Sequence, residues 1–259
     1  MIRYAANLSL LYPDRPFLER FAAARASGFS AVEFMFPYAA GLDAVEEALT
    51  DHQLQLILFN LPAGRWEDGE RGIAILPDRR SEFREGVAEA IRYATRLQCS
   101  RINCLAGILP GDLSADEAWA TLADNTAYAA DRLAEHGIRL MVEAVNSLDI
   151  PGFFLNTPTR VEKLLDQIQR PNAYIQYDVY HTQRMQGELI GTFKRLASRI
   201  GHVQIADNPG RHEPGTGEIH YDHVLQAFEE LGYEGFVGLE YIPAADTDAG
   251  LRWLPREKR

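Results

Sequence analysis

Residues 137–143 read GIRLMVE: a glycine, a run of mainly apolar residues and a terminal glutamate. The same arrangement returns as GFSAVE at 28–33 and as GYEGFVGLE at 232–240. A glycine suits the left-handed position that follows a helix, and a short apolar run suits a buried parallel strand. Each unit therefore predicts a helix end, then a strand, then a glutamate where the strand meets its following loop.

Outward from these units, short apolar runs alternate with stretches of helical periodicity such as Arg79–Leu97 and Ala115–His136. Eight runs are expected strands: Ile2–Leu8, Ala31–Phe36, Leu54–Asn60, Arg101–Gly107, Ile138–Glu143, Ala173–Asp178, His202–Ala206 and Phe236–Glu240. Eight strands alternating with helices favour an α/β fold closed into a (β/α)8 TIM barrel over an open doubly wound sheet. No Pro-, Gly- or Ser-rich linker divides the chain, so we predict one catalytic domain over residues 1–259.

Composition excludes several classes of partner. The net charge is −11, whereas nucleic acids and anionic membrane surfaces attract proteins with clustered Lys and Arg. The sequence shows no secretory signal and no apolar stretch of membrane-spanning length. Its two cysteines, Cys99 and Cys104, are too few for a disulfide framework. We expect a cytoplasmic enzyme with a small-molecule substrate, either monomeric or homo-oligomeric.

Polar residues stand at the carboxyl ends of four consecutive predicted strands. They are Glu143, Asp178, Gln204 and Glu240. In a barrel these ends meet at one mouth, where active sites lie. Three carboxylates and an amide oxygen form a hard ligand set that suits Mg²⁺ or Mn²⁺. The sequence therefore predicts a divalent metal site built from these four residues.

A structural interpretation competes with this prediction. A single strand-terminal carboxylate is more often a helix N-cap or a surface ion-pair partner than a metal ligand. Four polar ends in succession favour the site, because apolar strands would gain little packing from carboxylates aimed at a common axis. Glu33 fits the repeat, but its neighbours on other strands are Asn7, Asn60 and Asn103, which are uncharged. We therefore expect Glu33 to be structural or to support the site indirectly.

Two further residues follow predicted strands six and seven. His181 lies three positions after Asp178, and Arg211 lies in the segment after Gln204. A guanidinium suits a substrate carboxylate, and an imidazole can hold a hydroxyl or share a proton. The long irregular segment Leu61–Asp78 is also expected to be functional, either covering the mouth or building a subunit contact.

Motifs spread over nearly the whole chain carry a family resemblance. The chain resembles the hydroxypyruvate isomerase family, within the xylose-isomerase-like TIM barrel superfamily, through AANLSLLYP, AVEFMFPY, FNLPAG, GERGIA, INCLAG, IQYDVYHTQRMQGEL, GHVQIADNPGRHEPGTGEI and GLEY. The resemblance implies an intramolecular oxidoreductase that interconverts aldose and ketose forms. Its reaction would be the reversible conversion of hydroxypyruvate to 2-hydroxy-3-oxopropanoate (tartronate semialdehyde) through an enediolate.

The resemblance also implies residue roles. The positions matching Glu143 and Glu240 serve as proton donor and acceptor in that family. Those matching Glu143, Asp178, Gln204 and Glu240 hold a divalent metal. His181 and Arg211 match residues on the substrate side. These are the catalytic, metal-binding and substrate-binding residues that we expect.

Three alternatives remain open. Glu143 is followed by Ala144, where the family pattern leads us to expect Glu-Pro, so the substrate could instead be a four-carbon 2-oxo sugar acid (a 2-oxotetronate isomerase) or a ketose, for an epimerase. Metal-assisted phosphodiester cleavage would need several histidine-held metals and a basic groove, and this acidic chain shows neither signal. A non-catalytic binding protein is the third class.

Overall fold

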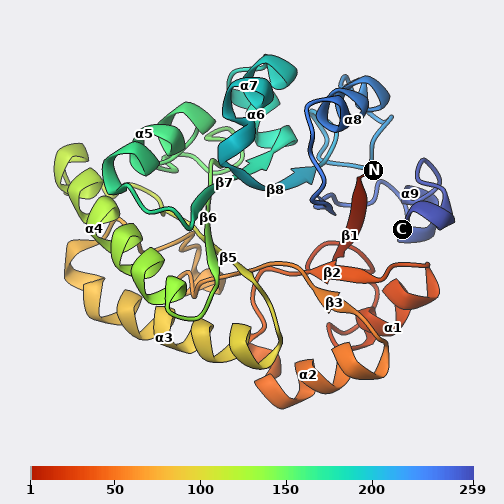
Figure 1. The fold of residues 1–259 in the computed structure, drawn as a ribbon, viewed down its shortest axis with the longest axis horizontal. Coiled ribbons are helices and arrows are strands. Elements are labelled where there is room, and N and C mark those ends of the chain that lie inside the picture. The colour runs from red at the N-terminus through yellow and green to blue at the C-terminus, as the bar shows by residue number, and fades with distance from the viewer. Residues whose placement is uncertain (1) are drawn as a thin grey trace.

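The computed structural model describes residues 2–259 and arranges its strands in one parallel sheet, ordered β3-β2-β1-β9-β8-β7-β6-β5-β4. Figure 1 shows the helices outside a ring of strands. The strands are β1 (Arg3–Asn7), β2 (Ala31–Glu33), β3 (Gln55–Leu56), β4 (Phe59–Asn60), β5 (Arg101–Cys104), β6 (Arg139–Glu143), β7 (Ala173–Asp178), β8 (Ile200–Ile205) and β9 (Phe236–Leu239).

The sheet closes through the segment 55–60. Its first part, β3, pairs with β2, and its second part, β4, pairs with β5. Between them, the Ile57 amide donates to the Val32 carbonyl at 2.9 Å. β3 and β4 are thus two ends of one barrel strand, and the predicted eight-stranded (β/α)8 barrel is confirmed.

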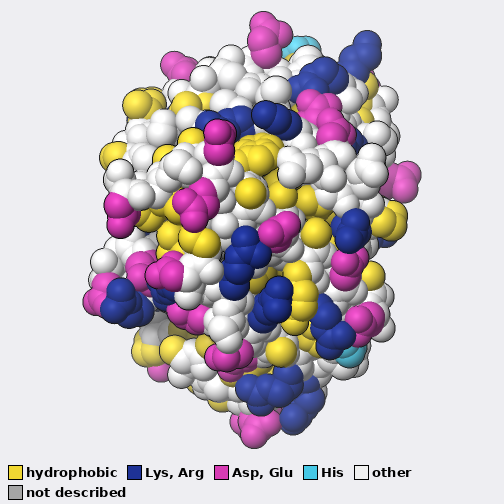
Figure 2. Space-filling model, turned by 90° about the vertical axis from the view of Figure 1, so that its left-hand side faces the viewer, with side chains coloured by type: hydrophobic (Ala, Val, Ile, Leu, Met, Phe, Trp, Pro, Cys, Tyr) yellow, Lys and Arg dark blue, Asp and Glu magenta, His cyan; other side chains and the backbone are white. Residues whose placement is uncertain are grey.

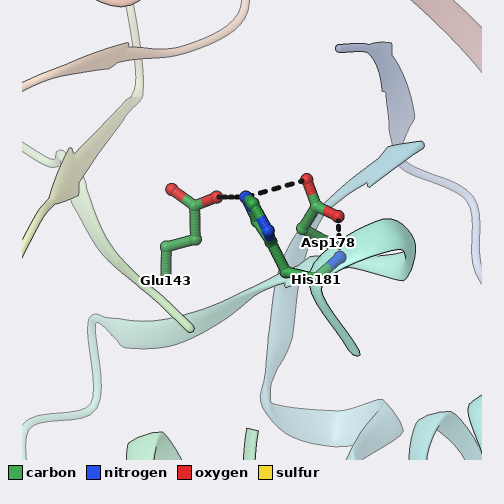
Figure 3. A group of neighbouring side chains, drawn as sticks. All are labelled: Glu143, Asp178 and His181. Atoms are coloured by element: carbon green, nitrogen blue, oxygen red, sulfur yellow. Dashed lines mark hydrogen bonds and ion pairs between the residues drawn. The ribbon is translucent and has the colours of Figure 1, made fainter. Parts of the chain in front are cut away.

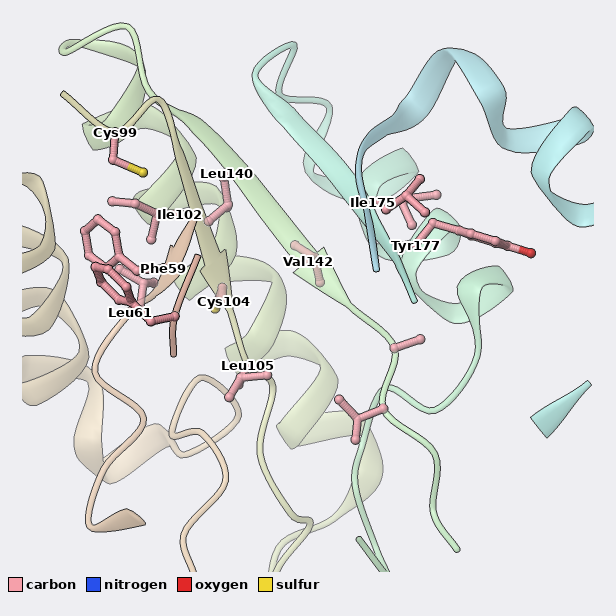
Figure 4. Close-up of a cluster of buried hydrophobic side chains, with 14 of the residues drawn as sticks. Phe59, Leu61, Cys99, Ile102, Cys104, Leu105, Leu140, Val142, Ile175 and Tyr177 are labelled. Carbon is pink, nitrogen blue, oxygen red and sulfur yellow. The ribbon is translucent and has the colours of Figure 1, made fainter. Parts of the chain in front are cut away.

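The break between β3 and β4 has a packing cause. Ile57 belongs to a small cluster inside the barrel with Ala5, Ala31 and Phe236. Phe59 packs instead in the large cluster between the strands and the helices (Figure 4). Regular alternation would put residues 57 and 59 on the same side of the sheet, so the pleat slips by one residue here. The sequence predicted one continuous strand over Leu54–Asn60, which is wrong at this point.

Helices follow the strands in the order expected for βα units. They are α1 (Glu19–Ala26), α2 (Leu42–Asp51), α3 (Arg80–Arg96), α4 (Ala115–Ala134), α5 (Pro158–Ile168), α6 (Val179–Met185), α7 (Leu189–Leu196), α8 (Tyr221–Glu230) and α9 (Thr247–Gly250). The helices predicted at Arg79–Leu97 and Ala115–His136 are confirmed as α3 and α4, with ends one or two residues shorter. Ser114 and Thr157 cap α4 and α5 by accepting a backbone N–H at the third helical position.

Figure 4 shows the apolar layer between β4–β7 and the surrounding helices. Ile102, Cys104, Leu140 and Val142 point outward from neighbouring strands and are at most 1% exposed. Both cysteines are buried and free, and burial raises each thiol pKa to about 12. Because alternate residues of each strand face this layer, the others project into the barrel, where the polar residues collect.

Three arginines lie at the amino ends of the strands, away from the acidic residues. Arg3 lies over the ring of Phe236, 4.1 Å from its centroid, and Arg139 lies over that of Tyr174 at 5.3 Å. Arg101 donates from Nε to the carbonyl of Gly201 at 3.1 Å. The open mouth therefore lies at the opposite, carboxyl end.

The three glycines of the repeat all have positive φ, 103° at Gly28, 68° at Gly137 and 84° at Gly232, as predicted for positions after a helix.

None of the helices within residues 2–259 has both the length and the apolar character needed to cross a bilayer. On the face drawn in Figure 2, basic and acidic side chains are interspersed among hydrophobic ones, so no extended basic surface appears there.

Candidate active site

The carboxyl ends of neighbouring strands bring three acidic side chains to the mouth. Glu143 is the last residue of β6, Asp178 the last of β7, and Glu240 directly follows β9. Their exposed fractions are only 5%, 2% and 6%. Burial of three carboxyl groups costs free energy, and such burial is typical of a functional site.

Glu143, Asp178 and His181 lie close together (Figure 3). His181 Nε2 lies 3.8 Å from Glu143 Oε1 and 4.0 Å from Asp178 Oδ2. One ligand atom from each residue lies within 4.8 Å of the others, so this buried group could hold a metal ion. Asp178 also caps α6, because its Oδ1 accepts the backbone N–H of His181 at 2.8 Å. The N-cap interpretation of Asp178 is therefore confirmed, and its role as a metal ligand stays a prediction.

The electrostatics of the site raise the pKa of each of the three carboxyl groups. Burial, reinforced by the charge of Asp178, raises the pKa of Glu143 to about 8. Burial raises the pKa of Asp178 to about 6, although Arg211 opposes the shift. Burial and the neighbouring carboxylates raise the Glu240 pKa well above its ordinary value. A cation among these groups would remove their mutual repulsion.

Arg211 provides positive charge at the same place. Its Nη2 lies 3.4 Å from Glu240 Oε1, and its buried Nε has no hydrogen-bond partner among the residues that the structure describes. The loop after β8 holds it there, because the Asp207 carboxylate accepts backbone N–H groups from Gly215, Gly217 and Ile219. Arg211 also has φ +56°, an uncommon conformation for a residue with a side chain, and such strain collects at functional sites.

Gln204 lies in a buried layer of polar side chains with Glu33. Gln204 Nε2 donates to Glu33 Oε1 at 2.8 Å, while Gln204 Oε1 accepts from Gln176 Nε2 at 2.5 Å. Glu33 also accepts from Asn7 Nδ2 at 3.0 Å, and its Oε2 lies 2.6 Å from His202 Nε2. Glu33 therefore orients Gln204, which agrees with the supporting role expected for it.

The mouth opens into a pocket of about 440 Å³. Its lining includes Glu143, His181, Arg211 and Glu240, so four of the six predicted site residues face one space. Asp178 and Gln204 are not among its lining residues and lie deeper in the barrel, buried to 2% exposure. Apolar side chains complete the walls, including Leu105, Val145, Ile150 and Phe153.

Trp66 and Arg71 are among the pocket residues that the sequence did not single out. Both lie in the segment Leu61–Asp78, which was expected to be functional and reaches the mouth. The Arg71 guanidinium lies over the Trp66 ring, 4.2 Å from its centroid, and Arg71 Nη1 donates to the Trp66 carbonyl at 2.9 Å. The GERGIA motif was the available signal, but nothing in its composition distinguishes Arg71 from the exposed Arg65.

The donor set fits a hard divalent cation. Asp178 Oδ2 and Glu240 Oε2 are buried and accept no hydrogen bond within the described residues. Glu143 Oε2 accepts from Asn103 Nδ2 at 2.9 Å, which leaves its other oxygen toward His181. Buried acceptor oxygens without donors are costly, and a cation would satisfy them.

A family model described as "Xylose isomerase-like TIM barrel" matches residues 21–257. Hydroxypyruvate isomerase of Escherichia coli (strain K12) is 50% identical over 254 residues, covering 98% of each chain. A 2-oxo-tetronate isomerase of Cupriavidus necator is 41% identical, again covering 98% of each. Among solved structures, the crystal structure of an AP endonuclease, family 2, from Brucella melitensis aligns over 100% of both chains with a TM-score of 0.97 and 41% identity.

Proposed function

The chain belongs to the xylose isomerase-like TIM barrel family, and from this premise we propose that it is a hydroxypyruvate isomerase. It interconverts hydroxypyruvate and 2-hydroxy-3-oxopropanoate. The observation that carries the proposal is the pocket in which Glu143, Glu240 and Arg211 meet, two proton-transfer groups beside a guanidinium. The 50% identity to a hydroxypyruvate isomerase over nearly the whole chain supports the same activity.

The reaction needs two proton transfers at adjacent carbons. One glutamate removes a proton from C3 of hydroxypyruvate, and the electron pair becomes the C2–C3 double bond of an enediolate. A proton then returns at C2, and the hydroxyl proton of O3 passes to O2, which leaves an aldehyde at C3. We assign these transfers to Glu143 and Glu240, which exchange roles in the reverse direction. Positioned acid–base groups contribute about 10²–10⁴-fold each to such steps.

The raised carboxyl pKa values support these roles. A carboxylate with an ordinary pKa is a weak base near neutral pH, whereas one whose pKa lies nearer neutrality can both accept and return a proton. Burial supplies that shift at Glu143 and Glu240.

We propose Mg²⁺ or Mn²⁺ as the cofactor, held by Glu143, Asp178, Gln204 and Glu240. The partnerless oxygens of Asp178 and Glu240 support it, as does the second lone pair of Gln204 Oε1. When bound, such a cation stabilises negative charge that develops on substrate oxygens.

The substrate carboxylate needs cationic partners within an acidic protein. We assign Arg211 to this role, because its half-buried side chain lies beside Glu240 and its Nε makes no hydrogen bond within the described residues. Arg71 offers a second guanidinium on the opposite loop. His181 completes the substrate side as a hydrogen-bonding group.

Two buried free thiols, Cys99 and Cys104, agree with a cytoplasmic location.

A four-carbon 2-oxo sugar acid is the second candidate substrate. The 2-oxo-tetronate isomerase of Cupriavidus necator, 41% identical over 98% of both chains, supports it. The pocket volume of about 440 Å³ accommodates either acid, because both are smaller than the drug-sized ligands of ordinary pockets.

Steady-state turnover of hydroxypyruvate and of 2-oxotetronate, each with Mg²⁺ and with Mn²⁺, tests the proposal. We expect a higher kcat/KM for hydroxypyruvate. A preference for the four-carbon acid would reassign the substrate while keeping the site, and turnover of neither acid would overturn the proposed activity.

A further inference from the structure

Asn146 stands at the rear of the active site, three residues after Glu143, and is completely buried. Its Oδ1 accepts two backbone N–H groups, from Leu148 at 3.1 Å and from Asp149 at 2.8 Å. Only an oxygen can accept them, so the orientation of this amide is fixed. Its Nδ2 group, which can only donate, must therefore occupy the other side.

On that side Nδ2 faces two acceptors. It donates to Asp149 Oδ2 at 2.9 Å and lies 2.7 Å from His181 Nδ1. The backbone N–H of Asn146 also points at His181 Nδ1, at 3.4 Å. Two N–H donors converge on Nδ1, which must accept. A neutral imidazole carries one proton, so the proton of His181 lies on Nε2.

The surroundings of Nε2 agree with this assignment. Its nearest polar neighbours are acceptors, Glu143 Oε1 at 3.8 Å and Asp178 Oδ2 at 4.0 Å. Both distances are longer than the length of a hydrogen bond, so Nε2–H is free to donate to a bound ligand. His181 also lines the pocket, where a substrate would bind. An imidazolium carries protons on both ring nitrogens, so an Nδ1 that accepts hydrogen bonds also requires a neutral ring.

We propose that Asn146 is a positioning residue that holds His181 in the Nε2–H form, so that His181 donates a hydrogen bond to a substrate oxygen and is not a metal ligand. The donor role toward substrate rests on the proposed isomerase function, whereas the proton position does not. An Nε2–H nitrogen has no lone pair for a cation, which leaves the metal to the oxygen ligands. A neutral imidazole can stabilise an enediolate oxygen without a permanent charge of its own.

The amide of Asn146 and the carboxylate of Asp149 can be exchanged between the two positions, because Asn and Asp side chains have the same shape. In N146D/D149N, residue 146 keeps the oxygen that accepts the two backbone N–H groups, and its second oxygen faces His181 Nδ1. Because that oxygen can only accept a hydrogen bond, it would favour the tautomer with the proton on Nδ1 and no proton on Nε2. The matched control is D149N, which retains the Asn146 donor.

¹⁵N NMR of histidine-labelled protein, with H181N to assign the resonances, reads the proton position without any turnover. We expect a protonated Nε2 and an unprotonated Nδ1 in the wild type and in D149N, unchanged by Mg²⁺, and the reverse in N146D/D149N. A proton on Nδ1 of the wild type, or an Nε2 resonance shifted by Mg²⁺ coordination, would overturn the proposal.

Activity supplies the second readout. Loss of one preorganised donor typically lowers kcat about 10²–10³-fold, so N146D/D149N should fall by about 10²-fold or more relative to D149N. Equal kcat values in N146D/D149N and D149N would contradict the proposal that His181 donates a hydrogen bond to the substrate. If the wild type fails to convert hydroxypyruvate, the NMR result still decides the proton position, so the two proposals fail separately.

Discussion

Individual side chains in this site act through burial and charge. Glu143 and Glu240 are buried carboxyls whose pKa is raised, and Arg211 beside Glu240 opposes that shift. A guanidinium near a carboxylate substrate supplies charge-assisted hydrogen bonds, which are stronger than neutral ones. We therefore propose that the charged residues of the pocket divide between proton transfer and substrate binding.

We predict that the positive charge of Arg71 contributes to substrate binding. In Arg71→Met, the aliphatic stem can still pack on Trp66, but the positive charge is lost. A hydrogen bond to a charged group is worth about 1.5–3 kcal/mol, so KM for hydroxypyruvate should rise about 10–100-fold with a smaller change in kcat. Arg65→Met is the matched control, because Arg65 is exposed and pairs with Glu70 outside the pocket. Equal KM values in the two variants would exclude Arg71 from substrate binding.

At the scale of elements, the strands set the depth of each polar group. Repeating units of glycine, strand and glutamate predicted that Glu143 and Glu240 lie at one mouth, because carboxyl ends of parallel strands meet there. The same pattern includes Glu33, which instead lies inside the barrel against His202 and Gln204. Its position depends on contacts between β2 and β8, which are far apart in sequence.

β9 illustrates how tightly these elements fit. A Cβ atom at Gly238 would lie 2.3 Å from Glu33 Oε1, closer than such atoms can approach. Gly238→Ala should therefore displace Glu33 and lower the free energy of unfolding by about 1–3 kcal/mol, the usual range for overpacking.

Urea denaturation measures that change. Gly111→Ala is the control, because nothing lies within 4 Å of a Cβ at that position. The control should shift the free energy of unfolding by about 0.5 kcal/mol or less. Equal stability of Gly238→Ala and wild type would contradict the packing described here.

Other parts of the site could not be predicted from sequence. Trp66 and Arg71 come from a loop without periodicity, and the Asn146–His181 contact joins residues 35 positions apart. The break in the third barrel strand depends on how Ile57 and Phe59 pack on opposite sides of the sheet. Periodicity reports which face an element buries, whereas these features depend on three-dimensional contacts.

For the whole molecule, the buried carboxyl groups of the site make the free energy of unfolding depend on pH and on metal binding. The native state raises the pKa of Glu143 from 4.5 to about 8 and that of Asp178 from 3.8 to about 6. The folded protein thus binds these protons more tightly than the unfolded chain does. The resulting stabilisation is complete below the unfolded values and is lost as pH rises through about 6 and then about 8.

We therefore expect the Tm of the metal-free protein, measured in a chelator, to fall as pH is raised from about 5 to about 9. Mg²⁺ or Mn²⁺ should restore it at the alkaline end, by about 2.7 kcal/mol of stability at 100 times the Kd. Glu143→Gln removes the titration near pH 8 and should flatten that part of the profile. A Tm that rises across this range in the chelated wild type would contradict the electrostatic account.

We propose that Glu143 and Glu240 transfer the protons of an aldose–ketose isomerisation. Its most direct test is the rate of hydroxypyruvate conversion by wild type, Glu143→Gln and Glu240→Gln, with the exposed Glu135→Gln as a control for substitution itself. Glutamine keeps the shape of each side chain but cannot accept the proton. We predict that both site variants lose at least about 10²-fold in kcat while Glu135→Gln matches the wild type. Wild-type turnover in either site variant would contradict the claim.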